Sequence, residues 1–392
     1  MALGHGAKIV TDGLVFAYDM ENTIKSWKGA PTTNVVTNTN LDTGWSKDYN
    51  TSILYNDYPP PIGIDSQVVS FIDADGNGSG YWYSYGDYAP QNPSTTYCIS
   101  VWVRTIGNGF TLRAYTANNS ETGRQFTNEL TCPGDGQWHR LEFNPITTPS
   151  NTTSDSLSFQ FTSIPANQRC WLCAPQMTAS SIHYPFVAGT RSNTQALLDW
   201  TGNHTITASS LTYNSDGTFS FNGSSNYVSS SSVSLGGDPI VTVNQWIRRT
   251  ANFSNGGYWG LGGGSTNNGI NGYTSVTNKI GWDLWGQTTF HTGQDYPLNQ
   301  WVNVCWVKTA TTFTTSTLKI YINGAEFPLT TTVRNNSSTV NLRDSITIGR
   351  IADNINSYYA PGNIGGTQVY NRALTAAEIQ RNFTATRSRY GI

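Results

Sequence analysis

Apolar and polar side chains alternate at every second position in several short runs, and this period of two is the strongest constraint on the fold. Between residues 157 and 161 the apolar set is Leu, Phe and Phe. The run from Leu318 to Ile322 alternates in the same way and is followed by Asn323-Gly324. Such alternation gives a strand one buried face, and Asn-Gly between two strands favours a tight hairpin. The pattern predicts antiparallel β-sheets.

Composition agrees with an all-β chain and excludes some functions. Charged residues make up 12% of the sequence and aromatic residues another 12%, whereas a typical domain has about 25% charged residues. The aromatic content supplies enough apolar area for a packed core. The formal net charge of −2 gives no electrostatic case for binding nucleic acid or an anionic membrane surface. No apolar run is long enough for membrane insertion.

The length of 392 residues predicts more than one core, because single cores stop growing near roughly 250–300 residues. We expect two antiparallel β-sandwich (jelly-roll) domains, at residues 31–190 and 193–392. Residues 1–30 are too few for a core and form an expected N-terminal attachment segment. The stretch from Tyr184 to Ser192 is the expected hinge.

One helix is expected, and it is the last element of the chain. Thr375 is a good N-cap, and Glu378 three residues later completes a capping box. Leu374 and Ile379 have the spacing of a hydrophobic staple, and Phe383 follows Ile379 on the same face. We expect this face to pack on the edge of the second sandwich.

Spaced motifs in the second half resemble the laminin-G-like, concanavalin A-like jelly roll. They are Asp199-Trp-Thr-Gly-Asn203, Phe221-Asn-Gly-Ser-Ser-Asn-Tyr227, Trp301, Ile320-Tyr-Ile-Asn-Gly324, Ile346-Thr-Ile-Gly-Arg350, Gly362-Asn-Ile-Gly365 and Val369 to Ile379. The chain departs from that family at Asn222 and Asn226, where members commonly have Asp. This departure weakens any transfer of the calcium site of calcium-binding relatives.

Two terminal segments are similar to virion structural proteins of large tailed phages, especially those of marine cyanobacteria. They are residues 9–15 and 370–392. The first domain resembles a galactose-binding or carbohydrate-binding jelly roll, through residues 40–46 and 171–176. These resemblances imply a chain assembled in the bacterial host cytoplasm and located on the virion surface. Its implied partners are other virion proteins contacted through the N-terminal segment, a host-surface glycan, and further copies of the chain.

An aromatic cluster is the candidate glycan site. On a strand, Tyr81, Tyr83 and Tyr85 share one face. Flat aromatic faces stack on sugar rings, and the Tyr hydroxyls remain available for hydrogen bonds. The alternative interpretation is a sheet core or a subunit interface.

A short acidic loop is the candidate calcium site, and no other cofactor is expected. Asp73, Asp75 and Asn77 place oxygen ligands at the first, third and fifth positions of an EF-hand-like loop. Position twelve is Ser84, where an EF-hand needs a bidentate Glu. A polar turn is the alternative interpretation.

The five cysteines do not form a disulfide framework, because their number is odd and their spacing is wide. Cys170 and Cys173 have the spacing of half a zinc site, which Cys98 and Cys132 could complete. The alternative is that these side chains are small buried hydrophobes on strands.

Catalytic residue sets are missing from the sequence. The His residues form no i, i+4 metal pair, and there is no Gly-x-Ser-x-Gly elbow. Asp283 has no carboxylate partner at the strand spacing that a glycosidase on this fold would need. We therefore expect a non-enzymatic phage virion protein, either a capsid-decorating or a head-fibre protein that exposes glycan-binding domains. The alternatives are a tail-fibre or receptor-binding protein and a free carbohydrate-binding lectin.

Overall fold

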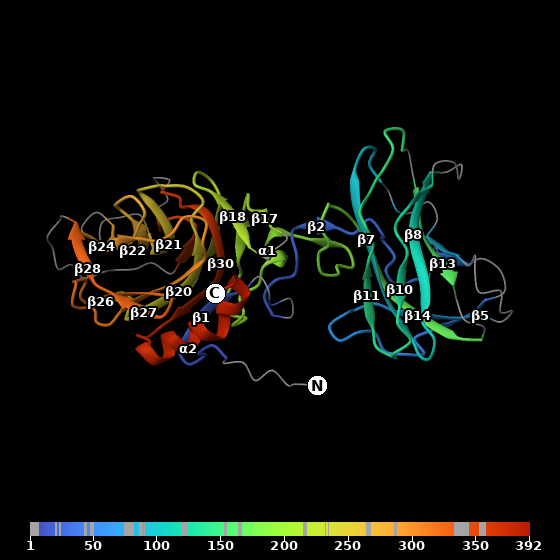
Figure 1. The fold of residues 1–392 in the computed structure, drawn as a ribbon, viewed down its shortest axis with the longest axis horizontal. Coiled ribbons are helices and arrows are strands. Elements are labelled where there is room, and N and C mark those ends of the chain that lie inside the picture. Colours follow the sequence, from blue (N-terminus) through green and yellow to red (C-terminus); the bar gives the residue numbers. More distant parts are fainter. Residues whose placement is uncertain are drawn as a thin grey trace. The chain divides into compact units, whose positions relative to one another are not determined.

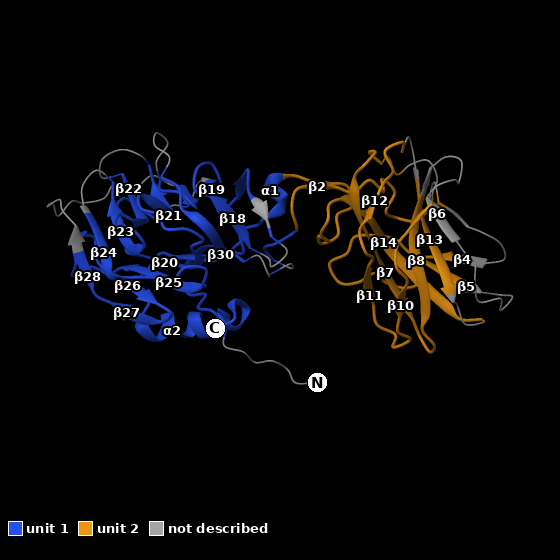
Figure 2. Cartoon of the chain, turned by 45° about the horizontal axis from the view of Figure 1, so that its top comes forward, with its two compact units in different colours: residues 1–28, 193–392 blue, residues 29–192 orange. Residues whose placement is uncertain are grey.

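The computed structural model describes two compact units (Figure 2). Unit 1 comprises residues 1–28 and 193–392, and unit 2 comprises residues 29–192. The described residues are 8–19, 22, 25–42, 45–47, 51–73, 82–85, 89, 91–118, 124–152, 155–163, 167–214, 218–231, 233, 235–263, 268–285, 288–332, 345–352 and 358–392.

Unit 1 is built from two antiparallel sheets, and its strands are drawn in Figure 1. In the first sheet the order is β17 (Thr212–Tyr213), β18 (Phe219–Asn222), β30 (Pro361–Tyr370), β20 (Val241–Arg248), β25 (Val302–Lys308), β26 (Leu318–Ile322) and β27 (Ala325–Phe327), with β1 (Leu14–Tyr18) beside β30. In the second sheet it is β16 (Thr207–Ser209), β19 (Tyr227–Ser231), β29 (Ser345–Ile348), β21 (Gly256–Gly262), β22 (Gly269–Thr274), β23 (Lys279–Leu284), β24 (Thr288–Asp295) and β28 (Leu329–Thr332).

Unit 2 also has two larger antiparallel sheets. One runs β10 (Leu130–Cys132), β8 (Phe110–Asn118), β13 (Asp155–Ser163), β6 (Trp82–Tyr85) and β3 (Trp45–Lys47), with β9 (Gln125–Phe126) on β8. The other runs β11 (His139–Glu142), β7 (Thr96–Thr105), β14 (Arg169–Ala179), β5 (Val68–Asp73) and β4 (Thr51–Tyr55), with β12 (Ile146–Thr147) on β7. A small ladder joins β2 (Thr32–Thr33) to β15 (Thr190–Arg191).

The all-β, sandwich-type fold class is confirmed, and the alternating runs face the cores as expected. Leu157, Phe159 and Phe161 are all buried in unit 2. In unit 1 the hairpin between β26 and β27 turns at Asn323 and Gly324, whose φ angles are 51° and 84°. Two consecutive positive φ angles are what a type I′ hairpin turn needs, and Asn-Gly tolerates them.

Three tryptophans form the centre of the core of unit 1. Trp259 of β21 lies 5.5 Å from Trp282 of β23 and 5.8 Å from Trp306 of β25, measured between ring centroids. Trp306 belongs to the first sheet and the other two to the second, so these contacts join the sheets. Gly272 makes room for this packing, because a Cβ there would lie 2.1 Å from Trp259 Nε1.

All five cysteines are buried, and none of them forms a disulfide bond. Cys132 and Cys170 pack in the main core of unit 2, whereas Cys173 belongs to a separate cluster. Cys170 and Cys173 are three positions apart on β14, so their side chains leave the strand on opposite faces. Among the described residues no group of three or more His, Cys, Asp or Glu could hold a metal ion. The interpretation as small buried hydrophobes fits this arrangement.

The C-terminal helix α2 (Ala376–Thr386) begins with the capping box that the sequence predicts. Thr375 Oγ1 accepts from the Glu378 N–H, and the Glu378 carboxylate accepts from the Thr375 N–H. A 3₁₀ turn, η1 (Arg387–Tyr390), extends it, and a short helix, α1 (Asn193–Ala196), is an additional element. No helix in the described part of the chain is long and apolar enough to cross a membrane.

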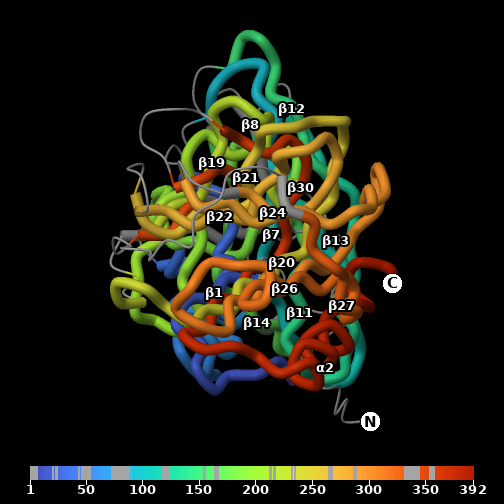
Figure 3. Tube along the Cα trace, turned by 90° about the vertical axis from the view of Figure 1, so that its left-hand side faces the viewer, coloured from blue at the N-terminus to red at the C-terminus, as the bar shows by residue number. Residues whose placement is uncertain are grey.

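This helix covers the outer face of the first sheet of unit 1. Trp246 of β20 stacks on Tyr390 with ring centroids 4.2 Å apart, and its ring also lies near Phe383. Its Nε1 donates to Thr386 Oγ1 at 2.9 Å. Figures 1 and 3 both show α2 beside β27. The helix therefore buries an indole that the sheet alone would leave exposed.

The described part of the N-terminal segment is built into unit 1, and its expected attachment role stays a prediction. β1 pairs with β30, with Ala17 opposite Gln368 and Tyr18 opposite Thr367. Phe16 and Tyr18 are fully buried. The apolar alternation at the start of the chain is therefore satisfied within the chain itself.

A buried amide ties this segment to the helix. Asn382 Oδ1 accepts from the Val10 N–H at 2.8 Å, and Asn382 Nδ2 donates to the Tyr370 hydroxyl at 3.0 Å. That hydroxyl donates to the Val10 carbonyl at 3.0 Å. Asn382 and Tyr370 have no exposed surface. The three residues close a ring of hydrogen bonds between the two ends of the chain.

The free edge of β1 is covered by the Asp199-Trp-Thr-Gly-Asn203 motif. Asp199 Oδ1 accepts from the Ala17 N–H at 2.9 Å, and the Trp200 N–H donates to the Ala17 carbonyl at 2.6 Å. His204 Nε2 lies 3.0 Å from the Val15 carbonyl. A loop thus provides the partners that a further strand would supply, which removes an exposed sheet edge.

Phe16→Ala should destabilise unit 1 by about 3–5 kcal/mol, because it leaves a cavity in a fully buried position. Urea unfolding of the whole chain should show an earlier transition for unit 1. Ile62→Ala is the control, since Ile62 is completely exposed in unit 2 and should change stability by no more than about 0.5 kcal/mol. An unchanged midpoint in Phe16→Ala would mean that the segment is not docked in solution.

Candidate functional site

The predicted glycan and calcium residues lie largely outside the described residues. Tyr81, Asp75 and Asn77 are outside them altogether. Tyr83 and Tyr85 lie on β6, between β13 and β3, and Asp73 ends β5, but their side chains are outside the description. Both assignments stay predictions.

Unit 2 contains an aromatic cluster that the sequence analysis did not single out. It lies on the sheet face that carries Cys173, and it includes Trp102, Trp138 and Trp171. The Arg104 guanidinium lies 3.7 Å from the Tyr58 ring centroid and 4.7 Å from that of Trp171. Arg104 is buried, and its guanidinium occupies one face of the Tyr58 ring and one face of the Trp171 ring. Trp102 and Trp138 stay partly exposed.

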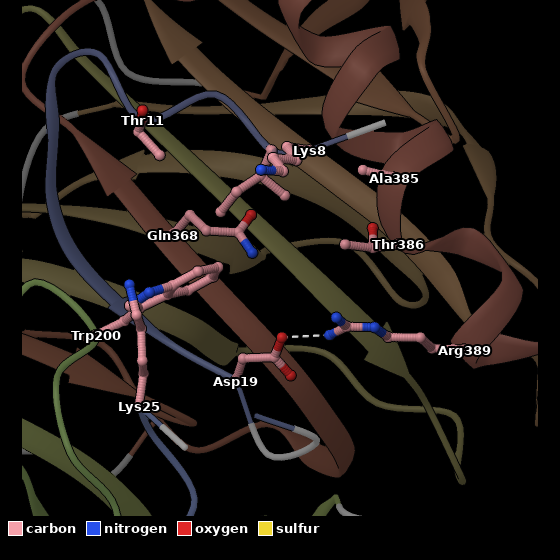
Figure 4. Close-up of a pocket in the computed structure, with 10 residues that line it drawn as sticks. Lys8, Thr11, Asp19, Lys25, Trp200, Gln368, Ala385, Thr386 and Arg389 are labelled. Carbon is pink, nitrogen blue, oxygen red and sulfur yellow. Dashed lines mark hydrogen bonds and ion pairs between the residues drawn. The ribbon is translucent and has the colours of Figure 1, made fainter. Parts of the chain in front are cut away.

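An open cavity of about 460 Å³ lies in unit 1, where the two ends of the chain meet (Figure 4). We name it the terminal cavity. Its described lining comes from the N-terminal segment, the end of α2 with η1, β30, and the motif that covers β1. The lining residues are Lys8, Ile9, Thr11, Asp19, Lys25, Trp200, Gln368, Ala385, Thr386 and Arg389.

The floor of the terminal cavity is polar and buried. Asp19, Gln368 and Thr386 each keep 5% or less of their surface exposed. Gln368 Oε1 accepts from Asn244 Nδ2 at 2.6 Å, which leaves Gln368 Nε2 without an acceptor among the described residues. Gln368 can therefore donate to a molecule in the cavity.

The walls combine an aromatic ring with an ion pair. Figure 4 shows Trp200 and Lys25 on one side of the cavity and Thr386 and Arg389 on the other. Trp200 is half-buried, so part of its ring is accessible. Arg389 forms an ion pair with Asp19, which fixes a carboxylate and a guanidinium at the floor.

This arrangement suits a hydroxylated ring. An accessible indole offers a flat apolar surface, and the surrounding amide, carboxylate and hydroxyl groups offer directed hydrogen bonds. Ligand pockets typically combine apolar or aromatic walls with a few oriented polar groups.

The sequence analysis did not predict this cavity, although two of its lining residues lie in or beside segments that the analysis named. Trp200 stood in a motif used only for family resemblance, and Asp19 follows directly on a strand that was assigned to an attachment segment. The alternation of Leu14, Phe16 and Tyr18 was the available signal, since a strand with a buried face must belong to a sheet.

Asp283 is a buried carboxylate on the outer face of the second sheet of unit 1. It lies opposite Asn271 on β22, and its Oδ2 accepts from Asn271 Nδ2 at 2.8 Å. Burial raises the pKa of Asp283 to about 7, and the Asn271 hydrogen bond only partly opposes this rise. The partner of Asp283 is an amide, which is not the second carboxylate that glycoside hydrolysis needs.

Asp283→Asn should stabilise unit 1 above pH 7 and leave it unchanged near pH 4. The folded pKa lies above the ordinary value of 3.8, so stability falls as pH rises between these values and is constant above them. The Asn side chain is neutral throughout and can keep the Asn271 hydrogen bond. We expect a gain of about 1–4 kcal/mol at pH 8, measured as urea midpoints across pH. Asp65→Asn, at an exposed site, should follow the parent profile, and parallel profiles for Asp283→Asn would contradict the assignment.

Comparison with protein families identifies part of unit 1. Residues 222–380 match the family model Laminin_G_3, described as the concanavalin A-like lectin/glucanases superfamily. The match covers less than half of the 392 residues and includes Gln368 of the terminal cavity. It confirms the concanavalin A-like resemblance of the second half. None of the comparisons indicates a phage origin.

Several solved structures are similar to part of the chain at low identity and low TM-score. Domain 4 of AbnA, an extracellular arabinanase from Geobacillus stearothermophilus, is 16% identical over 46% of this chain and 90% of its own, with a TM-score of 0.34. The C-terminal family 22 carbohydrate-binding module of Clostridium thermocellum Xyn10B is 14% identical over 45% and 99%, with a TM-score of 0.28. The receptor-binding domain of botulinum neurotoxin type G is 16% identical, with 48% of each chain covered and a TM-score of 0.34. No curated protein sequence matches significantly.

Proposed function

We propose that unit 1 is a glycan-binding module and that the terminal cavity is its binding site. One observation carries the proposal: an accessible Trp200 ring and the unpartnered amide donor of the buried Gln368 border the same cavity. A saccharide satisfies both groups at once, because its ring stacks on the indole and its hydroxyls accept from the amide.

The family match supports this function at the level of the fold. The concanavalin A-like superfamily includes lectins as well as glucanases. Asp19 is the single carboxylate among the described lining residues, and Arg389 already neutralises it. A pair of carboxylates acting on a glycosidic bond needs one free acid and one free base or nucleophile. We therefore propose binding without catalysis.

Trp200→Ala should reduce glycan affinity about tenfold or more, because it removes the stacking surface. A glycan array with multivalent protein, followed by calorimetry on the best ligands, measures this change. Trp285→Ala removes a half-buried indole at the end of β23 and should leave binding unchanged.

Tyr83→Ala and Tyr85→Ala test the aromatic cluster of unit 2 in the same binding assay. Repeating the assay with a chelator tests calcium binding at Asp73, Asp75 and Asn77. Glycan binding that is indifferent to Trp200→Ala would exclude the terminal cavity.

We further propose that the chain exposes this site on a bacteriophage particle, as a capsid-decorating or head-fibre protein. The two segments that are similar to phage virion proteins, 9–15 and 370–392, join in one part of unit 1 through β1, β30 and Asn382. Their contact in the folded chain supports the interpretation that the two segments resemble phage virion proteins as one structural unit. Many copies on a particle would turn weak single sites into firm attachment through effective concentration. The nearest alternative is a tail-fibre or receptor-binding protein.

Antibody labelling of purified particles should place the chain on the head. Because copies that decorate a capsid are numerous, we expect many labels per particle. Label at the tail tip would favour the receptor-binding alternative instead. A chain that is absent from particles but secreted or free in the lysate would be a free lectin.

A further inference from the structure

The described lining of the terminal cavity has a net charge opposite in sign to that of the whole chain. Lys8, Lys25 and Arg389 belong to it, and Asp19 is the one carboxylate among these described residues. Three cationic side chains thus face one anionic one, although the chain carries a net charge of −2. Basic groups are therefore concentrated at this site rather than spread over the surface.

The two lysines account for the excess of positive charge in the described cavity lining. The Asp19 carboxylate pairs with Arg389, so it does not neutralise a lysine. Lys25 Nζ lies 5.8 Å from the centroid of the Trp200 ring, and neither Lys25 nor Lys8 has a carboxylate partner among the described residues. Both side chains are exposed, so their ammonium groups are hydrated and can approach a ligand without a large desolvation cost.

The placement of the lysines matches a ligand that lies on Trp200. Lys25 is beside the indole, and Lys8 lies at the opposite end of the cavity (Figure 4). Gln368 Nε2 adds a donor at the floor. Ammonium and amide N–H groups donate and do not accept, so a ligand held between them must be rich in acceptor oxygens. Charge-assisted hydrogen bonds favour oxyanions in such a place.

We propose that the terminal cavity binds an acidic saccharide, with a sugar ring on Trp200 and a carboxylate or sulfate group that pairs with Lys25 or Lys8. This inference rests on the proposed glycan-binding function and narrows its ligand class. It also replaces the expectation, drawn from the low charge content of the sequence, that a glycan site in this chain would be uncharged.

The test is calorimetry on the full chain with matched oligosaccharides. The probes are a neutral oligosaccharide, a uronic-acid oligosaccharide and a sulfated oligosaccharide of equal length, with inorganic sulfate as the anion without a sugar. We expect at least one acidic probe to bind roughly tenfold more tightly than the neutral one, and this advantage to shrink between about 50 and about 200 mM salt because exposed charges are screened.

The double variant Lys8→Gln, Lys25→Gln should remove the preference for the acidic probe and leave neutral binding in place. Lys319→Gln is the control for loss of a lysine charge elsewhere, because Lys319 is a partly exposed lysine on β26 that pairs with Glu326 and lies outside the cavity lining. An unchanged melting temperature shows that the double variant is folded. The preference for uronic acid or sulfate in the parent identifies the source of the oxyanion.

Each failure has a separate meaning. Equal binding of neutral and acidic probes would overturn the acidic preference and leave glycan binding intact. Binding of no saccharide would overturn both proposals. Inorganic sulfate that binds as tightly as the sulfated sugar, with no effect of Trp200→Ala, would show an anion site that does not recognise a sugar.

Discussion

The buried amide of Asn382 is the interaction on which the ordered part of unit 1 near the chain ends depends. It pairs with the backbone of Val10 and with the Tyr370 hydroxyl, and neither Asn382 nor Tyr370 touches solvent. An unpaired buried polar group costs about 1–3 kcal/mol, so the N-terminal segment cannot leave without a penalty at the helix and at β30. The sheet face, α2 and β1 are consequently held as one structure.

The terminal cavity follows from that closure. Its floor comes from β30, the end of β1 and the end of α2, and its rim comes from the segments on either side of them. Asp199, which covers the edge of β1, also places Trp200 at the cavity wall. The same contacts that complete the sheet therefore bring an indole, an amide and several cations together, and no dedicated loop is required.

Local signals were sufficient for the strands, the Asn323-Gly324 hairpin and the capping box at Thr375 and Glu378, because each depends on neighbours in the sequence. The role of the N-terminal segment was not predictable in this way, since Val10 and Asn382 are 372 positions apart. The low content of charged residues does not indicate where these residues lie in the folded chain. Lys8, Lys25 and Arg389 become one group only when the chain ends meet.

Unit 2 is continuous in sequence, whereas unit 1 needs both ends of the chain. During synthesis, β1 leaves the ribosome long before its partner β30, so β1 must wait while unit 2 and the intervening strands of unit 1 emerge. Domains generally fold as units as they are made, and unit 2 can therefore complete its sandwich early. Until β30 has emerged, β1 cannot close on it, and a product truncated before β30 keeps an unpaired apolar strand that proteases and chaperones can recognise.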